Sequence, residues 1–153
     1  MDGKAEGLLR VLVTEEAVLV ELTRLAGELR RALVASNFER VNAVARQMDR
    51  ASRTLRDAER ERERIVAEMA GPGATVRDLD GSAIPGLDDA RARLAAAVES
   101  LQDTQEQNAS IILGASRLVD RWLGVIVRLV DPTYGAEGKA FHGGEPRFVS
   151  KSV

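Results

Sequence analysis

The side chains that most often carry out chemistry are scarce in this chain of 153 residues. It has one histidine, His142, no cysteine, and no G-x-S-x-G, P-loop or H-E-x-x-H pattern. The sequence therefore offers no nucleophile–base pair, disulfide framework or thiolate metal site. His142 alone does not predict a zinc site, because zinc normally takes three or four protein ligands. We expect no enzyme, and neither a metal nor a cofactor.

The only tyrosine lies in an unusual setting. Tyr134 belongs to 131-DPTYGAEGKAFHGG-144, a segment with four glycines that follows a long apolar helical pattern. These glycines have no strand before them and no helix after them, so they do not predict a phosphate-binding loop. They indicate a flexible C-terminal tail, residues 131–153. Because tyrosine combines an apolar ring with a polar tip, we interpret Tyr134 as a docking residue.

The composition favours a helical scaffold for these residues. Hydrophobic residues make up 44% of the chain but aromatic residues only 3%, which favours helix packing over a β-sandwich. The 22 basic and 24 acidic residues give a net charge of −2, so nucleic-acid binding is not indicated. Glu15 and Glu16 interrupt the first apolar stretch, which argues against a signal peptide or a membrane span. We expect a cytoplasmic protein without membrane insertion.

Apolar residues spaced three and four apart predict an all-α fold, an antiparallel three-helix bundle with coiled-coil-like packing. The helices are expected at about 5–34, 37–69 and 87–130, with a connector at 70–86 and the bundle covering 1–130. The apolar stripe of the first helix comprises Leu12, Val18, Leu19, Leu22, Leu25, Ala26, Leu29, Ala32 and Leu33. That of the second comprises Val41, Val44, Met48, Ala51, Leu55, Ala58, Ile65 and Met69.

Local signals define the links between helices. The sequence 36-SNFE-39 predicts a capping box in which Ser36 and Glu39 bond each other's backbone N–H groups. This makes the first link very short, so the first two helices must be antiparallel. Gly71-Pro72-Gly73 ends the second helix, and 75-TVRDL-79 can form one helical turn capped by Thr75.

The charge run 56-RDAERERER-64 is interpreted as a solvated helix face. Its signs alternate, so that Glu59 and Arg62, Arg60 and Glu63, and Glu61 and Arg64 are three residues apart. Pairs at this spacing stabilise an exposed helix by about 0.2–0.5 kcal/mol each. Arg62 also falls where one further apolar residue of the stripe was due.

The third helix has the most regular pattern and ends before Asp131-Pro132. Its heptad positions are Leu87, Ala90, Leu94, Ala97, Leu101, Thr104, Asn108, Ile111, Ala115, Leu118, Trp122, Val125 and Leu129. A buried Asn in such a seam can fix the register of the helices, which is our interpretation of Asn108.

The third helix is too long for its partners. At 1.5 Å per residue the first two helices span about 45–50 Å and the third about 65 Å. The apolar stretch 120-DRWLGVIVRLV-130 should therefore extend beyond the turn near Ser36. An uncovered surface of this kind marks an interaction site, and its Trp122 is a typical anchor. Three alternatives stay open: the connector shifts the helix, the tail covers the patch, or the patch pairs with a second copy.

Several features together resemble the flagellar export chaperone FlgN family. A Gln/Asn-rich turn, 105-QEQN-108, precedes an apolar helix, then 133-TYGAEG-138 and a loose basic end. Two antiparallel helices and a Pro/Gly connector come before them. The segment 139-KAFHGGEPRFVSKSV-153 departs from familiar members.

The resemblance implies a cytoplasmic, non-enzymatic chaperone for the hook–filament junction proteins FlgK and FlgL. It also implies delivery of these clients to the flagellar type III export gate, with FlhA as the gate protein. The client's C-terminal helical segment would bind Leu118, Val119, Trp122, Val125, Ile126 and Leu129. The tail with Tyr134 would contact the client or the gate.

A different class of function also fits the periodicity: a self-associating coiled-coil scaffold or adaptor without a role in secretion. The tail favours the carrier, because a scaffold gains nothing obvious from a flexible segment with one aromatic anchor. A carrier should be monomeric or self-associate only weakly, whereas a scaffold should be a stable oligomer.

Overall fold

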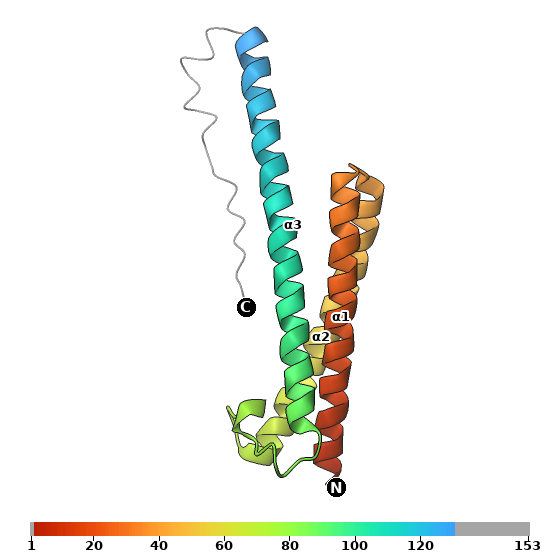
Figure 1. Cartoon of the computed structure of the whole chain (residues 1–153), viewed down its shortest axis with the longest axis vertical. Coiled ribbons are helices and arrows are strands. Elements are labelled where there is room, and N and C mark those ends of the chain that lie inside the picture. Colours follow the sequence, from red (N-terminus) through yellow and green to blue (C-terminus); the bar gives the residue numbers. More distant parts are fainter. Residues whose placement is uncertain (1, 131–153) are drawn as a thin grey trace. The chain divides into compact units, whose positions relative to one another are not determined.

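A computed structural model of the chain describes residues 2–130, and it describes side-chain burial through Gly114 and again at Arg117 and Gly124. Three helices follow one another: α1 (Gly3–Val34), α2 (Phe38–Ala70) and α3 (Leu87–Val130). A short 3-10 turn, η1 (Val76–Asp78), lies in the connector (Figure 1). No strand occurs within residues 2–130, so the predicted all-α fold is confirmed.

The contacts divide the chain into two compact units, Met1–Ile112 and Leu113–Val153. The first contains α1, α2, the connector and the beginning of α3, and the description of packing below is confined to it. The predicted division into a bundle at 1–130 and a tail at 131–153 stays a prediction. So does the extension of 120–130 beyond the first turn, since that depends on how the units are placed.

The link between α1 and α2 is only three residues long, as expected, but its cap differs from the prediction. Asn37 N–H donates to the carbonyl of Ala32 (2.9 Å) and Ser36 N–H to that of Leu33 (3.1 Å), which is a Schellman motif. Ser36 takes the left-handed conformation this motif requires, with φ of 53°. The predicted capping box at Ser36 and Glu39 is therefore wrong: Asn37 caps α2, and its Oδ1 accepts from Arg40 N–H at 3.1 Å.

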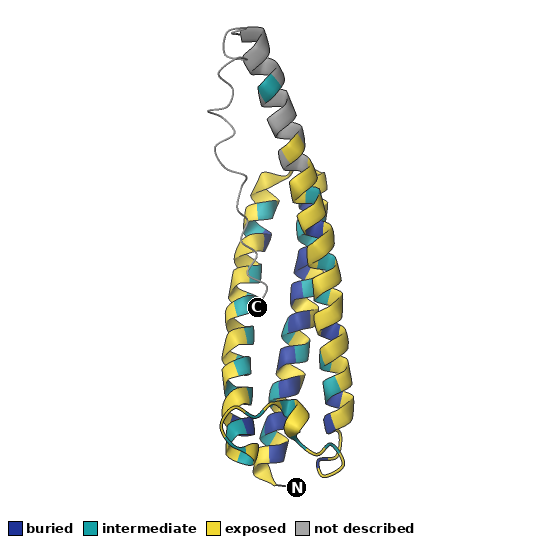
Figure 2. Ribbon diagram, turned by 90° about the vertical axis from the view of Figure 1, so that its left-hand side faces the viewer, coloured by how far each residue is buried: buried dark blue, intermediate teal, exposed yellow. Residues whose placement is uncertain are grey.

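The predicted apolar stripes form the interior of the first unit. Every position predicted for the stripes of α1 and α2, and for α3 as far as Ile111, is buried or half-buried. Figure 2 shows the buried residues on the faces that the helices turn towards one another. Asn108 lies beside Ala26 and Arg93 beside Glu16, so α3 runs parallel to α1 and the order is up-down-up.

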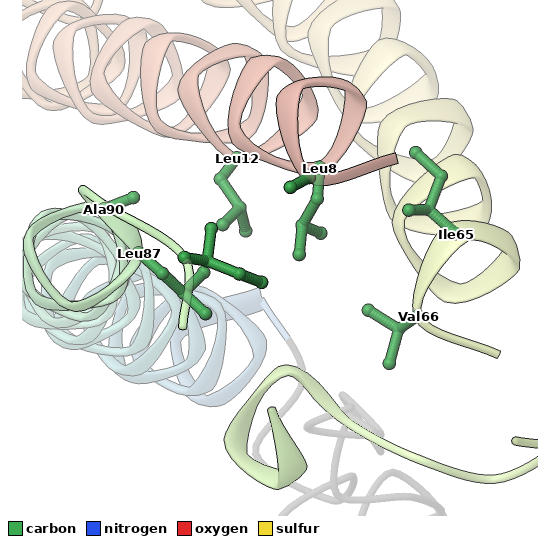
Figure 3. Packing of buried hydrophobic residues seen from close by; sticks show 8 residues of the cluster. Leu8, Leu12, Ile65, Val66, Leu87 and Ala90 are labelled. Atoms are coloured by element: carbon green, nitrogen blue, oxygen red, sulfur yellow. The ribbon is translucent and has the colours of Figure 1, made fainter. Parts of the chain in front are cut away.

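A cluster of buried apolar residues lies where α2 ends and α3 begins. Its core residues come from all three helices and the connector (Figure 3): Ala5, Leu8, Leu12, Ile65, Val66, Ile84, Leu87 and Ala90. Leu8 and Leu87 have no exposed surface. Burying side chains of this size stabilises the fold by about 1.5–3 kcal/mol each. This cluster fixes the connector against the helices.

The connector is ordered by its own polar contacts. Asp78 accepts hydrogen bonds from the Thr75 N–H (2.6 Å) and hydroxyl (3.1 Å), and these bonds lower the pKa of its carboxyl. The turn predicted at 75–79 is thus present. From α3, the Arg91 guanidinium donates to the carbonyls of Val76 and Leu79, the latter at 2.7 Å. One arginine therefore holds both ends of η1.

Candidate functional site

A groove lies between the end of α2, the connector and the beginning of α3. We call it the α2–α3 groove; its volume is about 1250 Å³, and Leu12 of α1 contributes to its lining. Its other lining residues are Arg62, Glu63, Val66, Ala67, Pro72, Gly73, Ala74, Thr75, Val76, Arg77, Arg91, Ala92, Leu94, Ala95 and Val98. Most of these are apolar, and Val98 keeps 38% of its surface exposed. The sequence did not predict this groove, because each of its walls comes from a different element.

Beside the groove, one buried ion pair joins α1 to α2. Arg62 Nη1 donates to Glu15 Oε2 at 3.0 Å, and only 1% of the Glu15 side chain is exposed. The other carboxylate oxygen, Oε1, has no hydrogen-bond partner within the described part of the chain. Burial raises the pKa of Glu15, and repulsion from Glu59 and Glu63 adds to it, although Arg62 opposes the shift.

The pairing of Arg62 corrects the interpretation of the charge run as wholly solvated. Arg62 bonds Glu15 on α1, and Arg60 lies 3.8 Å from Asp57 on its own helix. Only the pair of Glu61 with Arg64, at 2.6 Å, matches the prediction. The signal for the buried pair was present, since Arg62 and Glu15 both occupy positions where an apolar residue was due.

Between α3 and α1, Asn108 of α3 makes a second buried contact. Its Nδ2 donates to the Ala26 carbonyl at 2.8 Å, and the residue is only 5% exposed. Its Oδ1 has no partner in the described residues. The neighbouring Gln107 accepts a bond from Arg30. The Gln/Asn-rich segment 105–108, which is helical and part of α3, thus contacts α1 through one buried and one exposed hydrogen bond.

The predicted client-binding residues all lie within the helical backbone of α3: Leu118, Val119, Trp122, Val125, Ile126 and Leu129. At about 100° per residue their Cα positions fall within an arc of about 120° on one side of the helix. Their side chains lie outside the described set, and Tyr134 lies outside the described residues altogether.

Comparison with models of protein families identifies the family of this chain. The family model described as "FlgN protein" matches residues 1–141. The chain belongs to the FlgN family. The match covers all three helices and residues 131–141, which include Tyr134. Comparison with curated proteins and with solved structures gave no significant match.

FlgN membership identifies a flagellar export chaperone, a class of proteins that bind other proteins and do not catalyse reactions. Within residues 2–130 no group of three or more His, Asp or Glu side chains is arranged to hold a metal ion. Over the same residues, no helix is long and apolar enough to span a membrane.

Proposed function

We propose that this FlgN-family chain is a cytoplasmic chaperone for the hook–filament junction proteins FlgK and FlgL. The C-terminal half of α3 binds the helical C-terminal segment of each client. The chaperone then delivers the client to the export gate protein FlhA, with Tyr134 contributing to the docking of client or gate. Family membership supports the chaperone role in general; the clients and the gate are the proposal.

One observation carries the choice of site. Six apolar residues of α3, among them the only tryptophan of the chain, share one side of a continuous helix. An amphipathic client helix can lie along such a face with its own apolar stripe, as in other helix-in-groove complexes. Trp122 at the centre of this face is the type of residue that most often dominates a protein interface.

Binding can be followed through Trp122 itself. A client peptide without tryptophan, taken from the C-terminus of FlgK or FlgL, should shift the emission of Trp122 to shorter wavelength as water leaves the indole ring. The double variant Trp122→Ala/Leu129→Ala should lose retention of full-length FlgK and FlgL in pull-down while its helicity by circular dichroism is kept. Val20→Ala, on an exposed position of α1, is the matched control.

Capture of the chaperone from native cytoplasm identifies its partners, and light scattering at two concentrations gives its oligomeric state. Co-purification of FlgK and FlgL with a largely monomeric chaperone is the expected result. Full retention of both clients by the double variant would show that the site lies elsewhere. A stable oligomer that retains neither client would support the self-associating scaffold instead.

A further inference from the structure

We propose that the α2–α3 groove is a second protein-binding site, which takes an amphipathic helix with acidic residues flanking its apolar stripe. The site belongs to the first compact unit and is separate from the client-binding residues proposed on α3. It does not depend on the identity of the clients.

The size of the groove favours a peptide segment. Its volume, about 1250 Å³, lies above the roughly 300–1,000 Å³ typical of small-molecule pockets. Along α3 it extends from Arg91 to Val98, which at 1.5 Å per residue is about 10 Å, or two turns of a docked helix. Two turns present three or four apolar side chains on one face of an amphipathic helix.

The side chains on the α3 wall of the groove are short, which allows a docked helix to approach closely. Ala92, Ala95 and Val98 are exposed and three residues apart, so they form one row along the surface of α3. Short side chains in such a row leave a shallow channel, and the distance between packed helix axes depends on side-chain size at the contact. Val66 of α2 lines the groove from the core and is only 1% exposed, so the apolar surface opposite α3 comes from the half-buried Ala67 and Val76.

The charges of the groove select for carboxylates. Three arginines line it, against one carboxylate, that of Glu63. Each guanidinium carries five N–H donors. Arg62 gives one bond to Glu15, and Arg77 makes no ion pair within the described residues. Arg91 bonds two carbonyls and Asp88 and its Nε is buried, so Arg77 is the groove arginine whose guanidinium has no ion pair among the described residues.

The same charges argue against a second copy of the chain as the occupant. Two copies docked symmetrically through the same patch would bring the groove of one copy to that of the other. The three arginines of one groove would then face the three arginines of the other, with one glutamate on each side, and like charges across an interface are repulsive. A helix with glutamates beside its apolar stripe meets both requirements, apolar contact and guanidinium pairing.

The absence of cysteine from the chain allows a direct test. In the full-length Ala95→Cys variant, the thiol lies in the groove, and its rate of reaction with a soluble disulfide reagent reports access. The probe is a designed peptide of about 16 residues, long enough to be partly helical, with a leucine stripe flanked by glutamates. We expect this peptide to slow the reaction at saturation. Ala17→Cys, on an exposed position of α1, should react at an unchanged rate.

Two matched pairs of variants complete the experiment. Arg77→Glu should weaken peptide binding about tenfold, whereas Arg10→Glu, at an exposed position of α1, should not. Val98→Glu should abolish protection, whereas Val20→Glu should not. Circular dichroism verifies that each variant is folded.

Three results would overturn the proposal: equal protection by the peptide in which lysines replace the glutamates, binding that leaves the Ala95→Cys thiol reactive, or protection that rises with protein concentration without peptide. The last would identify a second copy as the occupant. Retention of FlgK and FlgL through Trp122 is a separate measurement, so failure here leaves that proposal standing.

Discussion

Arg62 on α2 reaches across the helix interface and donates a 3.0 Å hydrogen bond to the buried carboxylate of Glu15 on α1. Both residues occupy positions where the helical pattern called for an apolar side chain. Removing two charges from water is costly, and an ion pair in a protein interior often stabilises it less than well-packed apolar residues would. Replacing one partner should therefore have a different effect from replacing both.

Removal of Arg62 alone should be strongly destabilising. Arg62→Ala leaves the buried carboxylate of Glu15 without its only donor among the described residues, and we expect the free energy of unfolding to fall by about 3–5 kcal/mol. The double variant Glu15→Leu/Arg62→Leu should match or exceed the wild type in urea unfolding. Arg64→Ala, which removes exposed ion pairs, is the control and should stay close to the wild type. A double variant as unstable as Arg62→Ala would contradict this expectation.

Stability should depend on pH through Glu15. Its pKa in the folded protein is raised above the ordinary value of 4.5, mainly by burial, so its protonated form is favoured by folding. The stabilisation that this provides is complete below the unfolded pKa and is lost as pH rises through the folded pKa. Relative to Glu15→Gln, the wild type should therefore lose stability with rising pH, by at most about 1.4 kcal/mol per pH unit. The measurement is urea unfolding of both proteins from pH 4 upward, in steps of about one pH unit, which gives the difference in their free energies of unfolding at each pH. A difference that grows in favour of the wild type would mean that attraction to Arg62 outweighs burial.

Asn108 should tolerate no charge. Asn108→Asp replaces the donor to the Ala26 carbonyl with an acceptor and places a carboxylate in a buried site. We expect a loss of about 2–3 kcal/mol in the free energy of unfolding at neutral pH, and a smaller loss of about 1 kcal/mol for Asn108→Ala. Chemical unfolding of both variants is the measurement. Asn42→Asp, on an exposed position of α2, should be nearly neutral, and equal losses at the two sites would remove the role assigned to the buried bond.

Arg91 should govern the order of the connector. Lysine has a single ammonium group and cannot reproduce the planar fork with which Arg91 bonds the Val76 and Leu79 carbonyls. Arg91→Lys should therefore increase amide hydrogen exchange in residues 74–86 and destabilise the fold by about 1 kcal/mol, with α1 retaining its protection. Arg93→Lys, whose wild-type side chain is 57% exposed, is the matched control. Unchanged exchange in the connector would show that the core cluster alone orders it.

Tyr134 should affect docking without affecting the fold. Tyr134→Ala should leave the circular dichroism spectrum unchanged and reduce either client retention or FlhA binding in pull-down. Tyr134→Phe separates the contribution of the ring from that of the hydroxyl. A loss of helicity in Tyr134→Ala would instead assign the residue to the core.

The helices and their interior faces follow from the sequence alone. Spacings of three and four residues reflect the helical repeat, and burial depends first on which face of a helix is apolar. The seam of α3 was predictable residue by residue as far as Ile111, including the polar position Asn108. The short link between α1 and α2 was predictable for the same reason, because an apolar pattern stopped and restarted within a few residues.

Which residues pair with one another was decided only by the tertiary structure. The sequence marked Arg62 as misplaced in an apolar stripe, but it could not name Glu15, which lies 47 residues away. The local alternative, Glu59, is available on any isolated helix, and only the packing of α1 against α2 brings Glu15 closer. The cap at Asn37 likewise depended on the left-handed conformation of Ser36, which the sequence did not predict. The α2–α3 groove depended on how three separate elements pack together. Periodicity is a property of one helix at a time, whereas ion pairs and grooves are properties of the distances between helices.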